Sequence, residues 1–136
     1  MSEYFKSYLK RTNFDKYLKH LEKVLRNKKV VVYGSGMMFQ YIQNNYDLSK
    51  INIVGISDLK YSNNSEGEMS LGYKVIPKNL IADNNPDCVL IAIENYIDVV
   101  EELKISYREK NKNNIKVMPL VKKPFIDVIK YIWNVM

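Results

Sequence analysis

Two glycines one residue apart, Gly34 and Gly36, follow the apolar run 30–33 and come directly before a segment with helical spacing. A buried strand that turns sharply through glycines into a helix points backbone N–H groups outward, and the helix dipole adds about half a positive charge there. Ser35 lies between the glycines and Met37 follows them. The four residues predict a site for a phosphate group.

Two acidic residues are expected near this turn. Asp58 follows the apolar run 51–56, where a carboxylate can accept hydrogen bonds from ribose hydroxyls. Glu94 and Asn95 follow the run 88–93 and would lie at the carboxyl edge of the sheet, where open α/β sheets bind ligands. Glu94 and Asn95 could contact a sugar or ribose, although Asn95 could equally cap the next helix.

The turn also has a purely structural explanation. Gly34 and Gly36 could serve only to permit a tight bend, and Asp58 could simply begin a polar loop. Phe39 stands where the dinucleotide fingerprint has a third small residue, and a ring there would push the helix away from the strand. This departure counts against NAD in particular, because a phosphate depends mainly on the first two glycines.

The chain offers few groups for acid–base chemistry. His20 is the single histidine, and its place on the polar side of a predicted helix indicates a solvated side chain. Tyr46 and Lys50 have the spacing of the pair in short-chain dehydrogenases. In those enzymes the pair comes from a much later helix, whereas here it ends the helix that follows the phosphate turn. Val32 stands where a methyltransferase usually carries an acid. We therefore assign no catalytic residue and leave enzymatic activity open.

Helical and extended patterns alternate along the chain. Strands are predicted at 30–33, 51–56, 73–76, 88–93 and 115–118, with helices after the glycine turn, after Pro77 and from residue 97. The run 88–93 has no polar face, as a central parallel strand requires. Residues 59–72 are polar and predict a mobile loop. The alternation predicts an α/β fold with a doubly wound parallel sheet of about five strands.

Amphipathic helices are expected at both ends. Residues 1–28 form a predicted helical segment whose apolar stripe should lie against the sheet: Phe14, Leu18, Leu21 and Leu25. Residues 29–120 form the predicted central domain, and residues 121–136 a terminal helix with Phe125, Val128, Ile129, Ile132 and Trp133 on one face. We expect this helix to pack on the same domain, or across a two-fold axis as a homodimer.

The length of 136 residues, with 46% hydrophobic and 26% charged residues, predicts one globular domain. No apolar run approaches the roughly 18 residues of a transmembrane helix, and residues 1–6 lack a signal-peptide core, so we expect a cytoplasmic location. Cys88 lies in an apolar run and is expected in the core rather than in a redox or zinc site.

The net charge of +6 and the pI near 9.2 raise the question of nucleic acid. The basic residues are scattered along the chain, and the Lys-Lys pairs are only 28–29 and 122–123. No helix-turn-helix, RNA-recognition or zinc-finger pattern accompanies them. The sequence therefore favours a solvated basic surface over a nucleic-acid site and leaves a polyanionic partner open.

Four segments carry a family resemblance: residues 29–36, 53–58, 72–77 and 86–93. In this order they resemble the Rossmann-like domain at the front of bacterial sugar-nucleotide enzymes that build surface polysaccharides, the CapD-type dehydratases and epimerases and the PglD-like acetyltransferases. The resemblance covers about residues 28–120. It implies that Gly34, Ser35, Gly36 and Asp58 hold NAD(P) or a UDP-sugar.

Two hypotheses follow. In the first, the chain is a nucleotide-binding domain of bacterial sugar-nucleotide and polysaccharide metabolism that works beside a catalytic partner, and any activity of its own would be that of a partial epimerase or dehydratase domain. In the second, it is a non-catalytic structural or regulatory oligomerisation domain that has kept the fold without a ligand.

Overall fold

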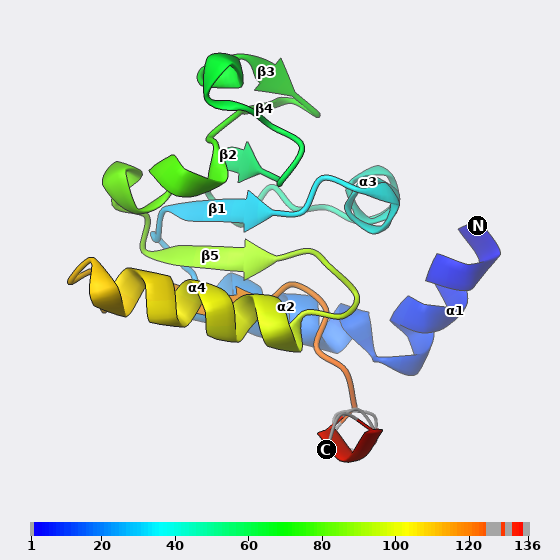
Figure 1. The fold of residues 1–136 in the computed structure, drawn as a ribbon. Helices are drawn as coiled ribbons and strands as arrows, with labels where there is room; N and C mark the ends of the chain where they lie inside the picture. The colour runs from blue at the N-terminus through cyan, green and yellow to red at the C-terminus, as the bar shows by residue number, and fades with distance from the viewer. Residues whose placement is uncertain (1, 125–128, 130–131, 135–136) are drawn as a thin grey trace.

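The computed structural model describes residues 2–124, 129 and 132–134 (Figure 1). Its helices and strands run in the order α1 (Ser2–Arg11), α2 (Phe14–Val24), β1 (Val30–Tyr33), α3 (Met37–Asn45), β2 (Ile53–Ser57), η1 (Asn63–Ser65), β3 (Met69–Ser70), β4 (Tyr73–Lys74), η2 (Lys78–Leu80), η3 (Ala82–Asn84), β5 (Cys88–Ile91), α4 (Ile97–Glu109) and β6 (Lys116–Pro119). The predicted α/β fold with a parallel sheet is confirmed.

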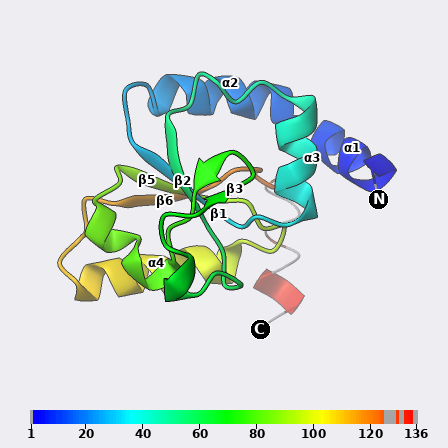
Figure 2. The same ribbon diagram turned by 90° about the horizontal axis from the view of Figure 1, so that it is seen from above.

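The main sheet has four parallel strands in the order β2-β1-β5-β6. A single parallel bridge from Ile56 to Val75 adds chain outside β2, at the position of a fifth strand. Helices α2 and α3 lie on one face and α4 on the other, as the view from above shows (Figure 2). The sheet is therefore covered on both faces, which a parallel sheet requires.

Alternate residues of β1 enter two separate cores, because successive side chains of a strand point to opposite faces. Val30 and Val32 pack with residues of α1, α2 and α3. Val31 and Tyr33 pack with residues of α4 and the short 3-10 helices. All four residues of β1 and all four of β5 are buried, as predicted for central strands.

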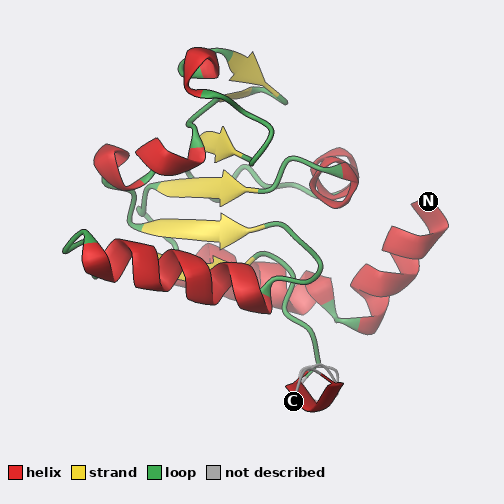
Figure 3. Ribbon diagram, viewed as in Figure 1, coloured by secondary structure: helices red, strands yellow, loops and turns green. Residues whose placement is uncertain are grey.

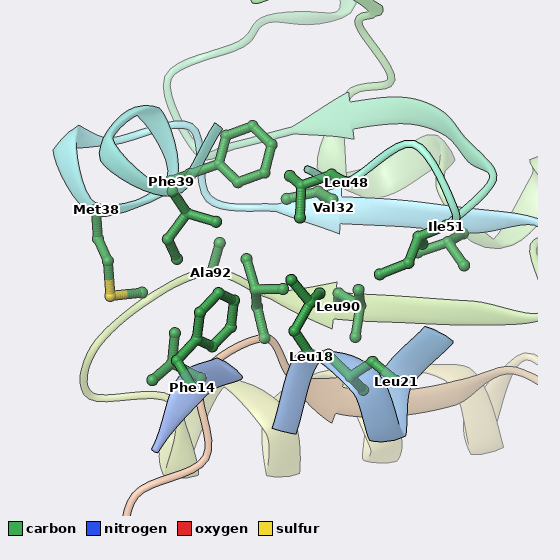
Figure 4. Packing of buried hydrophobic residues seen from close by; sticks show 14 of the residues in the cluster. Phe14, Leu18, Leu21, Val32, Met38, Phe39, Leu48, Ile51, Leu90 and Ala92 are labelled. Atoms are coloured by element: carbon green, nitrogen blue, oxygen red, sulfur yellow. The ribbon is translucent and has the colours of Figure 1, made fainter. Parts of the chain in front are cut away.

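The apolar stripe of α2 lies against the sheet as predicted. Figure 4 shows Phe14, Leu18 and Leu21 facing Val32 and Leu90 of the central strands. Cys88 is also a core residue, 1% exposed, and burial raises the pKa of its thiol to about 12. Its burial within the core confirms the prediction of a small core residue.

The N-terminal helical segment consists of two helices with a break at Thr12 and Asn13. Asn13 adopts the left-handed conformation with φ 53°. The hydroxyl of Thr12 donates to the carbonyls of Tyr8 and Leu9 at 3.0 and 3.2 Å. The hydroxyl thereby bonds the last carbonyls of α1, and α1 extends beyond the carboxyl edge of the sheet (Figure 1).

The prediction that residues 59–72 form a loop without packed elements was wrong. Strands β3 and β4 form a small antiparallel hairpin, visible as the separate pair of strands in Figure 3. Leu71 and Gly72 turn this hairpin with φ values of 53° and 87°. Two residues with positive φ suit the right-handed twist of a tight hairpin, but a leucine in the first place gives no sequence signal for it.

Residues 121–124 are not helical, so the predicted start of the terminal helix at residue 121 was wrong. Half of the predicted helix lies outside the described residues. Within it, Ile129, Ile132 and Trp133 are 47%, 44% and 79% exposed. The packing of this helix on the domain or on a second copy therefore stays a prediction. Among the described residues, no helix combines the length and the apolar character needed to cross a membrane.

Candidate functional site at the glycine turn

Gly34 directly follows β1 and lies between the carboxyl ends of β2 and β5. Its N–H donates to the carbonyl of Ser57 in β2 at 2.8 Å, and its φ is +114°. A Cβ at this position would lie 2.8 Å from the carbonyl oxygen of Ala92, just after β5. Gly34 is therefore required by both its backbone conformation and the close approach of a neighbouring chain segment.

The turn lies at the topological switch point of the sheet. From β1 the chain passes to α3 on one face, whereas from β5 it passes to α4 on the opposite face (Figure 2). The two connections therefore diverge at the carboxyl ends of β1 and β5. Open α/β sheets bind their ligands at the point where neighbouring connections diverge in this way.

Gly36 differs from Gly34 because nothing crowds it. It is the N-cap residue of α3 with φ −78°, and a Cβ built on it meets no atom within 4 Å. No side chain caps the start of α3. The N–H groups of Met37 and Met38 have no acceptor inside the helix, because they belong to its first turn. Met37 is 54% exposed.

Asp58 is bonded directly to the glycine turn. Its Oδ2 accepts the N–H of Ser35 at 2.7 Å and the Ser35 hydroxyl at 2.9 Å. Its Oδ1 accepts the N–H of Lys60 at 3.2 Å. Partial burial raises the pKa of Asp58, but these hydrogen bonds outweigh it and the pKa lies below its ordinary value. Ser35 and Asp58 thus form one unit with a fixed negative charge.

Glu94 lies on the loop after β5 and contacts the first helix. Its carboxylate accepts the hydroxyl of Tyr4 from α1, and this hydrogen bond raises the pKa of Tyr4. Asn95 accepts Nζ of Lys123 at 3.2 Å, and the N-cap position of α4 is Tyr96, without a side-chain cap. Asn95 therefore does not cap α4. No sequence pattern pointed to Tyr4, because the contact joins residues 90 positions apart.

Phe39 does not enter the turn. Its side chain is fully buried, and its ring centroid lies 6.4 Å from that of Tyr73. Figure 4 shows it pointing from α3 into the core beside Val32. The core accommodates the ring, and the backbone at Gly36 stays open.

A hydroxyl beside the turn lacks a partner. Ser57 is fully buried, and its Oγ forms no hydrogen bond within the described part of the chain. The carbonyl of the same residue holds Gly34 in place. Buried hydroxyls are nearly always paired, so a group that donates or accepts here would remove an energetic penalty.

The remaining candidates lie elsewhere. Tyr46 follows the last residue of α3 and packs edge-on against Phe14 at 4.9 Å between ring centroids. The nine residues of α3 separate it from the turn by about 13 Å. His20 is exposed on α2. Across the described ranges, no three His, Cys, Asp or Glu side chains are grouped to hold a metal ion.

The parallel sheet, its two covered faces and the glycine turn define a Rossmann-like domain. The family model for the N-terminal domain of C2185-like proteins matches residues 26–115, and the chain belongs to this family.

Two solved structures are similar to the chain. One is UDP-D-quinovosamine 4-dehydrogenase from Vibrio fischeri, at 15% identity and a TM-score of 0.44, over 76% of this chain and 84% of that one. The other is RSP in complex with β-NADH, at 16% identity and a TM-score of 0.43, over 89% of this chain and 65% of that one. A comparison with curated proteins finds no match.

Proposed function

We propose that this domain binds a sugar nucleotide or an NAD(P) dinucleotide at the glycine turn, with the diphosphate in front of Gly36. The observation that carries the proposal is the open space at Gly36, at the start of a helix and at the switch point of the sheet. The N–H groups of Met37 and Met38 would donate to the phosphate oxygens. A larger residue at position 36 would occupy the volume that the diphosphate needs.

The acidic residues would act on the sugar side of the ligand. Asp58 holds Ser35 through one carboxylate oxygen, and a ribose hydroxyl would donate to the other, which has one weak partner at 3.2 Å. Glu94 would accept a hydroxyl of the ligand in exchange for that of Tyr4. Asp58 is thus a positioning residue for the turn as well as a ligand contact.

The cellular role follows the resemblance to CapD-type and PglD-like proteins. In this role the domain serves bacterial surface-polysaccharide metabolism in the cytoplasm, and acid–base residues come from a catalytic partner. We assign no catalytic residue to this chain, so binding rather than catalysis is the activity to test first.

Isothermal titration with NADH, NADPH and UDP-N-acetylglucosamine tests the proposal. We expect one of the three to bind, and Gly36→Val to abolish binding while the thermal midpoint stays unchanged, because no atom opposes a side chain there. Met69→Val, a change on the exposed hairpin, is the control and should bind as wild type does. No heat with any ligand, or equal binding by the Gly36→Val variant, would contradict the proposal.

A second candidate function is assembly through the C-terminal segment. It is favoured by the exposure of Ile129, Ile132 and Trp133, three large apolar side chains close together in the sequence. Light scattering should then give a dimer mass for the wild type and a monomer mass for Trp133→Asp. Met69→Asp, which also places a charge at an exposed apolar position, should remain dimeric. A monomeric wild type would exclude this function.

A further inference from the structure

The excess positive charge of the chain is concentrated at one edge of the sheet. Three adjoining hollows, of about 660, 420 and 400 Å³, lie around β6, the edge strand that pairs with β5 on one side only. Their lining includes seven of the 21 Lys and Arg residues but one of the 15 Asp and Glu residues. The rest of the chain carries 14 of each kind and is neutral. The net charge of +6 therefore equals the net charge of the residues that line the three hollows.

The first hollow lies between β6 and α4. Lys104 and Arg108 of α4 line it together with Lys116 of β6, and all three are exposed. Lys116 and Met118 also line the second hollow, on the α2 side of the strand. The two hollows thus meet at β6, which lies between α2 and α4 (Figure 2).

The second and third hollows meet at His20. Lys28 lines the second, and Lys16, Lys122 and Lys123 line the third. The single acid, Asp87 in the second hollow, accepts the backbone N–H of Lys29 at 2.8 Å. Within the described residues none of the seven cationic side chains forms an ion pair. The cations are therefore available to an external anion.

An aromatic pair lies where the second and third hollows join. The His20 ring stacks on Tyr17 with centroids 6.0 Å apart and planes 28° from parallel. The Tyr17 hydroxyl donates to the Pro119 carbonyl at 2.9 Å, which anchors the pair to β6. His20 is exposed, and it lines both hollows. A basic groove with an exposed ring is the combination that binds single-stranded nucleic acids.

We propose that the three hollows form one groove for single-stranded nucleic acid. Lysine and arginine side chains on α2, β6 and α4, and on the segments that follow α2 and β6, contact successive phosphates, and a base stacks on His20. The grooved shape suits an extended chain of phosphates, because a flat anionic membrane could not enter the hollows on both sides of β6. This surface is separate from the glycine turn, so its test is independent of the nucleotide proposal.

Fluorescence anisotropy with a labelled oligouridine of about 12 nucleotides tests the groove. If all seven cations take part, raising salt from about 50 to 200 mM should weaken binding on the order of 10³-fold. The combined variant Lys16→Gln, Lys28→Gln and Lys116→Gln should bind at least about tenfold more weakly, with a salt slope shallower by about two. The combined variant Lys6→Gln, Lys50→Gln and Lys74→Gln has the same net charge, lies outside the groove and should bind nearly as wild type does.

The His20→Ala variant separates stacking from charge. It should lose about tenfold for oligouridine and nothing for heparin, which has no bases. Absence of oligouridine binding, equal losses in the two triple variants, or equal losses of the His20→Ala variant for both ligands would overturn the proposal. Tighter binding to anionic vesicles than to oligouridine would also overturn it, in favour of a membrane surface.

Discussion

Gly34 and Gly36 are glycines for different physical reasons. Gly34 combines a φ of +114° with backbone at 2.8 Å from any added Cβ, whereas Gly36 has an ordinary φ and empty space. Gly34 is thus a requirement of the fold, and Gly36 is not. A bound ligand would occupy the empty space in front of Gly36.

Gly34→Ala should therefore destabilise the protein by about 2–3 kcal/mol, whereas Gly36→Ala should change the free energy of unfolding by less than about 1 kcal/mol. Urea denaturation of the two variants measures both values. Equal destabilisation by the two changes would show that the space at Gly36 is occupied in the folded protein.

The bond between Asp58 and Ser35 makes stability depend on pH. The pKa of Asp58 is lowered in the folded state from its ordinary value of 3.8, so the unfolded chain binds more protons at low pH. The contribution of Asp58 is complete above this value and is lost as pH falls through the lower pKa of the folded state. Asp58→Asn, which keeps an oxygen for Ser35 but no charge, should flatten this part of the stability curve.

The measurement is the urea midpoint of wild type and Asp58→Asn from pH 7 to about pH 2.5. Asp47 also has a lowered pKa, held by Ser49 on the surface, and Asp47→Asn serves as the matched control. Parallel curves for wild type and Asp58→Asn would show that the carboxylate does not bind the turn as an anion.

At the scale of elements, α2 is held by its buried stripe rather than by caps. Leu21 is fully buried between α2 and the sheet, and the N-cap residue of the helix forms no side-chain cap hydrogen bond. Burial of an apolar side chain is the main source of helix stability in such a setting.

Leu21→Ala should accordingly cost about 2–5 kcal/mol, because it leaves a cavity under the helix. Leu59→Ala removes the same atoms from a side chain that is 75% exposed, and should cost less than about 0.5 kcal/mol. Chemical denaturation compares the two. A similar cost for both would mean that α2 does not rest on the sheet.

At the scale of the whole molecule, the cations around β6 repel one another. Seven of them line the hollows around this strand, against one acid, Asp87. Such self-repulsion destabilises the compact state and is screened by salt.

The melting temperature of the wild type should thus rise by about 2–4 °C between about 20 and 200 mM salt. The triple glutamine variant of the groove should have a higher melting temperature than the wild type at low salt, and this temperature should rise less as salt is added. The variant at positions 6, 50 and 74 should behave as wild type does, and a scanning fluorimeter records all three. An identical salt response in the three proteins would contradict the concentration of charge at β6.

The sequence by itself determined the alternation of strands and helices, the buried strand β1, the central place of β5 and the tight turn at Gly34 and Gly36. These features follow from apolar spacing and backbone freedom, which act over a few residues. The hairpin at Leu71 was not predicted, because its turn contains a leucine with positive φ, a conformation that the residue type does not indicate and that tertiary contacts stabilise.

Only the tertiary structure decided which distant residues meet. The bond from Asp58 to Ser35, that from Tyr4 to Glu94 and the gathering of cations around β6 all join segments far apart in the chain. Lysines that are scattered in the sequence line one edge, because α2, α4 and β6 come together only when the sheet forms. Charge acts through space rather than along the chain, so its pattern appeared with the fold.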